Sequence, residues 1–269
     1  MMNLFASFLL AFHIHLLEIS NPPSLDHPVE LIVWNVGQGQ WATFSTNEAC
    51  FHFDMGGEHA DWKKISSECG SKNNFAFFSH WDVDHLSFAQ SAPRHLKNFC
   101  VAAKPRGPCL SQKKLQIFSQ LHLCSTDVPP WIKEIFDLPD SKTSHFSSND
   151  YSRVFEINHW MIAQGDSPKK QERIWSRDIV ASRSIRVIVL GHHGSRTSSS
   201  EEFLTSLPGL KMGISSARMA RYGHPHQEVL DRLKDFGVAC LRTEYWGNIH
   251  IEMPVSKKAQ VNVPSSSEN

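Results

Sequence analysis

The chain has 269 residues, of which 41% are hydrophobic and 20% charged, with 27 Lys/Arg against 27 Asp/Glu. This composition excludes a disordered protein and is typical of one globular domain of about 240 residues. With a net charge of zero, the chain has no general excess of positive charge that would indicate nucleic-acid binding. The charges are unevenly spread, because residues 169–242 hold 13 Lys/Arg and 7 Asp/Glu. Such a local excess can hold a polyanion, although it is more often only solvated surface.

The N-terminal segment, residues 1–24, is separate from this domain in composition. Met1–Leu17 is almost wholly apolar and is followed by Asn21-Pro22-Pro23. Its length suits a signal-peptide core or a short anchor and is marginal for a full membrane span. No Lys or Arg precedes it and no A-x-A cleavage site follows, so a helix packed on the domain, or an incorrect start, is the alternative. We expect export or membrane anchoring rather than a cytoplasmic location, with membrane contact only through this segment.

Short runs rich in aromatic and β-branched residues predict the first strands of the domain. These runs are Leu31–Trp34, Trp41–Phe44, Ala49–Phe53 and Asn74–Phe78. Turns at 37–40 and 45–48 predict that the first three strands form an antiparallel meander. Residues 93–145 are less regular, with a helix expected near Leu110–Leu121.

The second half alternates strands with helices. A hairpin is predicted from Ser152–Ile157 and His159–Ala163, a helix over Ser167–Ser176 with Ser167 as N-cap and Pro168 as first residue, and strands at Ile185–Leu190, Lys211–Ser215 and Val238–Arg242. Further helices are expected over Glu201–Leu207 and Gln227–Phe236. The Ser-rich segment 257–269 is predicted to be a disordered tail.

Six cysteines are present, at positions 50, 69, 100, 109, 124 and 240, and none has C-x-x-C spacing. The spacing argues against a zinc ribbon or a thioredoxin-type redox pair. The even number permits disulfides, but a chain of this length does not need them to fold. Histidine is unusually abundant, with 16 residues, which is a first indication of metal chemistry.

Four predicted strands end in loops that carry Asp or His next to glycine or to further ligand-type residues. The loops begin at Asp54, His80, Asp166 and His192. In layered α/β folds such loops collect at one edge of the sheets. We therefore expect their side chains to form one constellation.

The segment His80-Trp-Asp82-Val-Asp84-His85 holds four candidate metal ligands in six residues. Alternate residues of an extended segment point the same way, so the first three ligands can face one pocket, and His85 joins them as the chain turns into a helix. Imidazole and carboxylate ligands suit Zn²⁺, Mn²⁺ or Fe, and the absence of Cys excludes a thiolate site. The alternative is a surface loop with chance histidines.

The other candidates have ordinary structural interpretations when taken singly. Asp54 suits a turn, Asp166 suits a helix entry, and the pair His192-His193 suits a buried histidine with an exposed neighbour. Their value is collective, because a carboxylate such as Asp166 is needed to bridge two cations. His224, in Tyr222-Gly-His224-Pro225, is a candidate to donate to a phosphoryl oxygen or a leaving group.

In this order, the motifs resemble the metallo-β-lactamase-fold domain of the ComEC family of competence proteins. The motifs are Asn35-Val-Gly-Gln-Gly39, Asp54-Met-Gly56, Ser79–His85, Gly165-Asp166, His192-His193-Gly194-Ser195 and Tyr222–Pro225. The resemblance runs from about residue 30 to residue 252 and lacks the multi-helix membrane channel of that family. It implies an αββα sandwich over residues 25–256, in which two mixed β-sheets are flanked by helices and metals lie at one edge.

The resemblance also implies the roles of the site residues. His80 and Asp82 would hold a first metal, Asp84 and His85 a second together with His193 or His192, Asp166 would bridge them, and Asp54 would orient a ligand from behind. The general fold family has H-x-H-x-D-H, so Asp82 replaces a histidine, and no further ligand histidine is evident before Asp166. This substitution gives one of the two metal sites more oxygen ligands and fewer imidazole ligands, which makes Mn²⁺ a candidate beside Zn²⁺.

The expected function is phosphodiester hydrolysis with two divalent cations, on DNA or another nucleotide substrate. Besides Asp84, His224 is expected to contact the scissile phosphate or the leaving oxygen, with Ser195 or Ser215 as lesser phosphate contacts. No stable protein partner is expected. Because this fold hosts many chemistries, a hydrolase of a cyclic nucleotide, a lactam or a thioester is an alternative. A non-catalytic binding module would predict a damaged ligand set, whereas this set is nearly intact.

Overall fold

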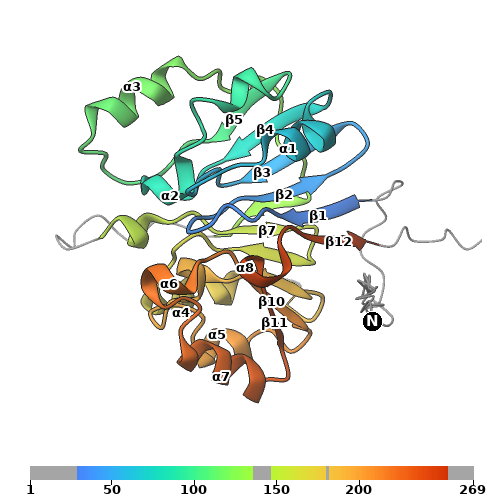
Figure 1. The fold of residues 1–269 in the computed structure, drawn as a ribbon. Helices are drawn as coiled ribbons and strands as arrows, with labels where there is room; N and C mark the ends of the chain where they lie inside the picture. The colour runs from blue at the N-terminus through green and yellow to red at the C-terminus, as the bar shows by residue number, and fades with distance from the viewer. Residues whose placement is uncertain (1–28, 136–146, 180–181, 254–269) are drawn as a thin grey trace, which may run out of the picture.

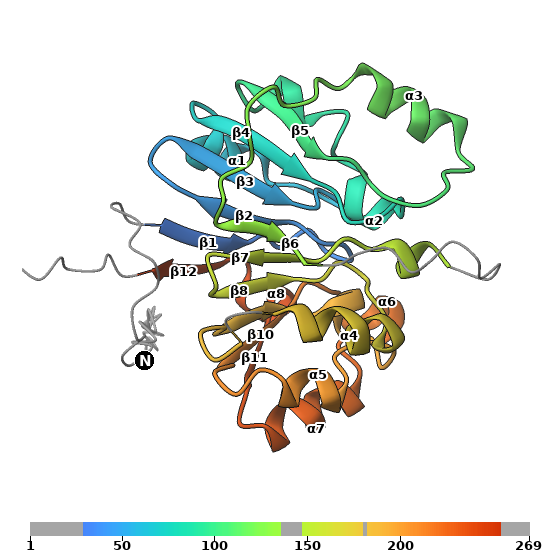
Figure 2. The same ribbon diagram turned by 180° about the vertical axis from the view of Figure 1, so that it is seen from behind.

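The computed structural model of the chain describes residues 29–135, 147–179 and 182–253. These residues form two six-stranded sheets that stack face to face with helices on their outer faces (Figures 1 and 2). The predicted αββα sandwich is therefore confirmed. The predicted N-terminal segment and Ser-rich tail lie outside the described residues. Within the described ranges, no helix combines the length and hydropathy that crossing a membrane requires.

The first sheet contains, from edge to edge, β12 (Ile249–Met253), β1 (Val29–Val33), β2 (Ala42–Ser45), β3 (Ala49–Phe53), β4 (Asn73–Phe77) and β5 (Phe99–Ala103). The second contains β11 (Ala239–Arg242), β10 (Met212–Ser215), β9 (Val187–Val189), β8 (Met161–Ala163), β7 (Phe155–Ile157) and β6 (Ile132–Glu134). Strands β1 to β3 form the predicted antiparallel meander. Strands β3 to β5 and β8 to β11 are parallel within their sheets, so their carboxyl ends gather at common edges.

The connecting helices are α1 (Trp62–Cys69), α2 (Val83–Leu86), α3 (Gln112–Gln120), α4 (Lys169–Trp175), α5 (Glu201–Thr205), α6 (Met219–Tyr222), α7 (Gln227–Asp235) and α8 (Thr243–Trp246). Single 3₁₀ turns lie at Ala92–Arg94, Ser148–Tyr151, Ser176–Asp178 and Gly191–Gly194.

Two local predictions were wrong in detail. Pro168, not Ser167, precedes the first turn of α4 as its N-cap, and the Ser167 hydroxyl instead accepts a hydrogen bond of 2.9 Å from Trp175 Nε1. The strand predicted from His159 begins only at Met161, because Asn158 and His159 have φ values of 52° and 51° and form the hairpin turn.

The main core lies between the two sheets, where Phe53 and Phe77 stack with ring centroids 5.1 Å apart and both contact Phe155. The outer faces of the sheets are covered as well, and Ile32 packs in a second cluster under the helices of the first sheet. Burial on both faces explains why strands such as β1 are apolar without alternation.

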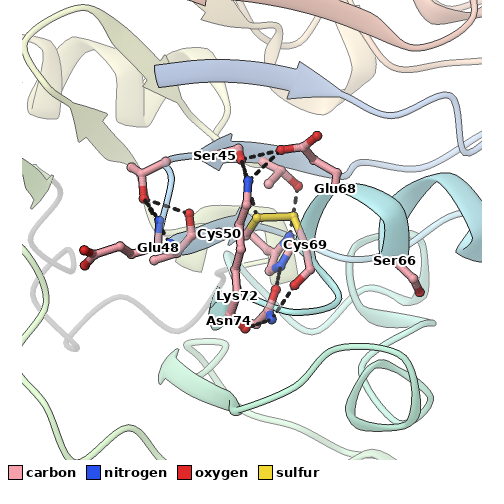
Figure 3. Close-up of a disulfide and its surroundings, with 12 residues drawn as sticks. Ser45, Glu48, Cys50, Ser66, Glu68, Cys69, Lys72 and Asn74 are labelled. Carbon is pink, nitrogen blue, oxygen red and sulfur yellow. Dashed lines mark hydrogen bonds and ion pairs between the residues drawn. A yellow bond between two sulfur atoms is a disulfide. The ribbon is translucent and has the colours of Figure 1, made fainter. Parts of the chain in front are cut away.

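Two disulfides fasten the first sheet to the elements that cover it. Cys50 of β3 is bonded to Cys69 at the end of α1 (Figure 3), and Cys100 of β5 is bonded to Cys124, beyond α3. The sequence left this question open, because spacing alone does not determine pairing. Cys109 is a free, half-buried thiol.

Removal of the first disulfide tests its contribution to stability. The bond spans a sequence separation of 19 residues, so its loss in the double variant Cys50→Ser/Cys69→Ser is expected to lower the free energy of unfolding by about 3 kcal/mol. Urea denaturation measures this change. The control Cys109→Ser removes an unpaired thiol and is expected to change stability by less than about 0.5 kcal/mol. Equal stability of the double variant and the parent would contradict the bond.

Candidate metal centre

Loops from both sheets meet at one edge of the sandwich, where α2, α4 and α6 also lie (Figures 1 and 2). Asp54 follows β3, His80 follows β4 and Asp166 follows β8. Asp166 Oδ1 is 2.9 Å from His85 Nε2, and its Oδ2 is 3.7 Å from His80 Nε2. Segments more than 80 residues apart therefore come within the spacing of a shared metal site.

The acidic and imidazole atoms form two groups. In the first, His80 Nε2 lies 3.4 Å from Asp82 Oδ2, and the ligand atoms of His80, His85 and Asp166 lie within 4.8 Å of one another. In the second, His193 Nε2 lies 3.2 Å from Asp84 Oδ2, and Asp84, His85 and His193 satisfy the same limit. Asp166 lies between the groups and faces them with different oxygens.

The buried atoms of this centre fit a divalent cation. The Nε2 atoms of His80, His85 and His193 and the Oδ1 atom of Asp166 are buried, and none makes a hydrogen bond. A buried polar atom without a partner costs about 1–3 kcal/mol. A cation that accepts nitrogen and oxygen ligands would satisfy these atoms together.

Neighbouring groups hold each imidazole in the tautomer that a metal ligand needs. His85 Nδ1 lies 2.7 Å from Asp54 Oδ2, and His193 Nδ1 lies 2.9 Å from the Ser216 carbonyl oxygen. Because these oxygens only accept, each Nδ1 carries the proton, which leaves the lone pair on Nε2. His80 Nδ1 lies 3.1 Å from Ser152 Oγ and 2.9 Å from Ser79 Oγ, and because Ser79 Oγ donates to Asp54, it accepts from this Nδ1.

Asp54 organises the centre from behind the ligands. Besides His85, its carboxylate accepts hydrogen bonds from the Ser79 amide at 2.8 Å and from Gln40 Nε2 at 3.2 Å. Its φ of 55° is in the left-handed region, which Asp tolerates better than most residues. The sequence indicated Asp54, but it did not indicate Gln40 or Ser152. Ser152 Oγ also accepts from the Asp166 amide at 3.0 Å, so it joins two predicted ligands.

The loop after β9 directs its two histidines differently. His192 and His193 have φ values of 49° and 57°, followed by Gly194 at 87°, where a Cβ would lie 2.6 Å from Pro225 Cβ. His193 is 2% exposed and faces the second group. His192 is more exposed, and its Nε2 lies 3.6 Å from Asp166 Oδ2. The geometry therefore favours His193 as the ligand. It places His192 at the partly exposed opening of the centre, its mouth.

His224 and the two serines surround this mouth in different ways. The His224 ring centroid is 5.8 Å from that of His192, and burial, then the charges of His192 and His193, lower the pKa of His224 to about 4. Ser195 Oγ lies 3.0 Å from the Thr197 hydroxyl. Ser215 Oγ donates to the His193 carbonyl at 2.9 Å, so it supports the ligand loop.

The charges at the centre favour a bound cation. Burial alone would raise the pKa of Asp166, but the charges of His85 and His193 lower it well below its ordinary value. Burial would likewise raise the pKa of Asp84, but the adjacent His193 and the charge of His85 lower it. Burial opposes a charge on His85 too, yet Asp166 and Asp54 raise its pKa well above 6.5. The carboxylates thus stay ionised and attract positive charge.

Comparison with known proteins gives no matching family model. The chain is 29% identical over 197 residues to ComE operon protein 3 of Bacillus subtilis, covering 64% of this chain and 23% of that protein. It is 25% identical over 230 residues to competence protein ComA of Neisseria gonorrhoeae, covering 82% of this chain and 32% of that protein. The chain thus spans about a quarter to a third of the length of these relatives.

Among solved structures, the metallo-β-lactamase fold protein YhfI of Bacillus subtilis superposes with a TM-score of 0.54, at 12% identity, over 84% of this chain and 100% of that one. The chain has the metallo-β-lactamase fold. Its predicted resemblance to the ComEC-type competence proteins is also confirmed. In this metallo-β-lactamase fold, the described carboxylates and imidazoles lie at the edge where the resemblance predicts the metals.

Proposed function

We propose that the chain is a metal-dependent hydrolase that cleaves phosphodiester bonds in DNA or another nucleotide substrate. The observation that carries the proposal is the position of Asp166, whose two oxygens face two separate groups of ligand atoms. Two divalent cations, Zn²⁺ or Mn²⁺, would supply a water of lowered pKa and stabilise the charge on the phosphoryl oxygens. The name of one relative, competence protein ComA, agrees with DNA as substrate.

The positions of the residues indicate which of them would hold each ion. His80 and Asp82 would hold the first ion, Asp84, His85 and His193 the second, and Asp166 would bridge them. With the bridging Asp166, the first ion would have two carboxylates and one imidazole, and this oxygen-rich set makes Mn²⁺ a candidate beside Zn²⁺.

The residues at the mouth would contact the substrate. His224 is neutral at physiological pH because its pKa is lowered to about 4, so one ring nitrogen can donate to a phosphoryl oxygen or to the leaving oxygen. His192 and Ser195 lie on the adjoining loop and would contact the same phosphate.

The two disulfides support a location outside the reducing cytoplasm, because such bonds persist mainly in oxidising compartments. We therefore propose that the domain is exported or membrane-anchored. We propose no stable protein partner for it.

A substrate panel tests the activity. We expect the parent with Mn²⁺ or Zn²⁺ to cleave single-stranded DNA and bis-p-nitrophenyl phosphate, and Asp84→Ala to lose both activities, because it removes a ligand of the second group. The control Asp178→Ala changes an exposed carboxylate away from the centre and is expected to keep full activity. Undiminished cleavage by Asp84→Ala would overturn the proposal.

The second candidate, a hydrolase of a small substrate, is favoured by the zero net charge of the chain. Turnover of nitrocefin or a glutathione thioester without cleavage of DNA would select it. A purified chain without bound metal would instead indicate a non-catalytic binding module.

A further inference from the structure

Three exposed aromatic side chains lie on α6 and α8, two helices that are hydrogen-bonded to each other beside the metal centre. Among the described Phe, Tyr and Trp residues, those more than half exposed are Tyr222, Tyr245 and Trp246, at 60%, 67% and 59%. Tyr222 ends α6, and the other two end α8. We call these three residues the aromatic strip. Soluble proteins seldom leave several aromatic side chains together in water, so the strip indicates a binding surface.

The strip is continuous with the metal centre. Helices α6 and α8 are joined by a hydrogen bond of 3.2 Å from the Met219 amide to Glu244 Oε2, and they lie near each other in Figure 1. The Tyr222 ring centroid is 6.1 Å from that of His224, which in turn is 5.8 Å from that of His192. A ligand on the strip would therefore extend to the mouth of the centre.

An arginine lies over each of the two tyrosine rings of the strip. The Arg221 guanidinium lies 5.6 Å from the Tyr222 ring centroid, and that of Arg242 lies 5.1 Å from the Tyr245 ring centroid. Arg218 adds a third guanidinium, which is 2.8 Å from Glu58 Oε1. Glu58 and Glu244 offset part of this charge, so the surface remains positive and suits an anionic ligand.

This combination matches one class of ligand. Aromatic rings stack on bases, and arginines bind phosphates and stack on bases as well. In a duplex the base faces are stacked and inaccessible, whereas in a single strand they are free. We propose that the aromatic strip binds the unpaired bases of single-stranded nucleic acid whose backbone runs into the metal centre. The path of the backbone into the metal centre rests on the proposed function, whereas the binding surface itself does not.

Binding is measured by fluorescence anisotropy with a labelled twelve-residue oligothymidylate, in full-length Asp84→Ala protein so that the strand stays intact. Adding Tyr245→Ala and Trp246→Ala is expected to raise Kd about tenfold or more, because each stacked base contributes substantially to affinity. Tyr245→Phe and Trp246→Phe keep the rings and should keep the affinity. The control Phe236→Ala removes an exposed ring at the end of α7 and should leave Kd unchanged.

An abasic strand of equal length separates stacking from charge. The alanine variant should bind it as well as the unsubstituted strip does, since no base is present to stack. An unchanged Kd for oligothymidylate, or an equal loss of affinity for the abasic strand, would overturn the proposal. Binding to anionic phospholipid vesicles but not to oligothymidylate would also overturn it, because the strip would then be a membrane contact.

Hydrolysis of bis-p-nitrophenyl phosphate distinguishes this proposal from the proposed function. With Asp84 intact, the two alanine substitutions should leave that hydrolysis unchanged, since Tyr245 and Trp246 lie on α8 and not among the residues that would contact the phosphate. Weakened oligothymidylate binding without any metal-dependent hydrolysis in the parent would support the strip and refute the function. Metal-dependent hydrolysis by the parent, together with an unchanged Kd of the alanine variant for oligothymidylate, would support the function and refute the strip.

Discussion

Asp166→Asn is expected to remove bound metal from the purified chain and to lower phosphodiester hydrolysis by roughly 10³-fold or more. The amide keeps the size of the side chain but loses its charge and one of the two oxygens that face the ligand groups. It would also direct N–H groups toward imidazole nitrogens or a cation, in place of a ligand atom. Metal content is measured by mass spectrometry and activity as kcat/KM on bis-p-nitrophenyl phosphate.

Asp54→Asn is the matched comparison, because it changes an equally buried carboxylate that touches His85 rather than the cation position. Loss of such a supporting group weakens metal affinity by about 10–100-fold, so excess metal should restore its activity. It should not restore Asp166→Asn. An Asp166→Asn protein that kept the parent's metal content would exclude the shared centre.

Acidification is expected to destabilise the fold through His52, which is fully buried under the first sheet. Trp41 Nε1 donates to His52 Nδ1 at 3.2 Å, so Nδ1 accepts and Nε2 carries the proton. Nε2 then donates to Asn74 Oδ1 at 2.9 Å, and the Asn74 amide donates in turn to three backbone carbonyls. Protonation of Nδ1 would remove the acceptor of the Trp41 hydrogen bond and leave a buried charge, and burial lowers the pKa of His52 to about 4.

The unfolded chain binds this proton near pH 6.5 and the folded chain only near pH 4. The stability that depends on neutral His52 is therefore complete above about pH 6.5 and is lost as the pH falls to about 4, by up to about 3 kcal/mol. Urea denaturation between pH 4 and 7 measures the loss. His52→Gln should flatten this dependence, whereas His122→Gln, at an exposed position, should not. Parallel pH curves for the parent and His52→Gln would contradict the prediction.

Most of the ligand set could be predicted from local sequence. His80, Asp82, Asp84 and His85 lie within six residues directly after β4, so the alternation of an extended segment brings their side chains to one side. Asp54 and Asp166 likewise follow the ends of β3 and β8. The parallel order of these strands then leads the loops to one edge.

The supporting groups could not be predicted in this way. Ser152 is 72 residues from His80, and a lone serine carries no signal of its own. The choice between His192 and His193 depends on three consecutive left-handed residues, which local sequence does not specify. The partners of Cys50 and Cys100 depend on which helix or loop packs against β3 and β5.

The sequence by itself determined the identity of the candidate ligands, because strand-end motifs are local properties of the chain, and the order of these motifs provided the resemblance that implied the sandwich architecture. Only the tertiary structure decided the tautomer of each imidazole, the preference for His193 over His192 as a ligand and the position of the aromatic strip beside the mouth of the centre. These features depend on distances between side chains from different sheets and loops, and packing alone fixes such distances.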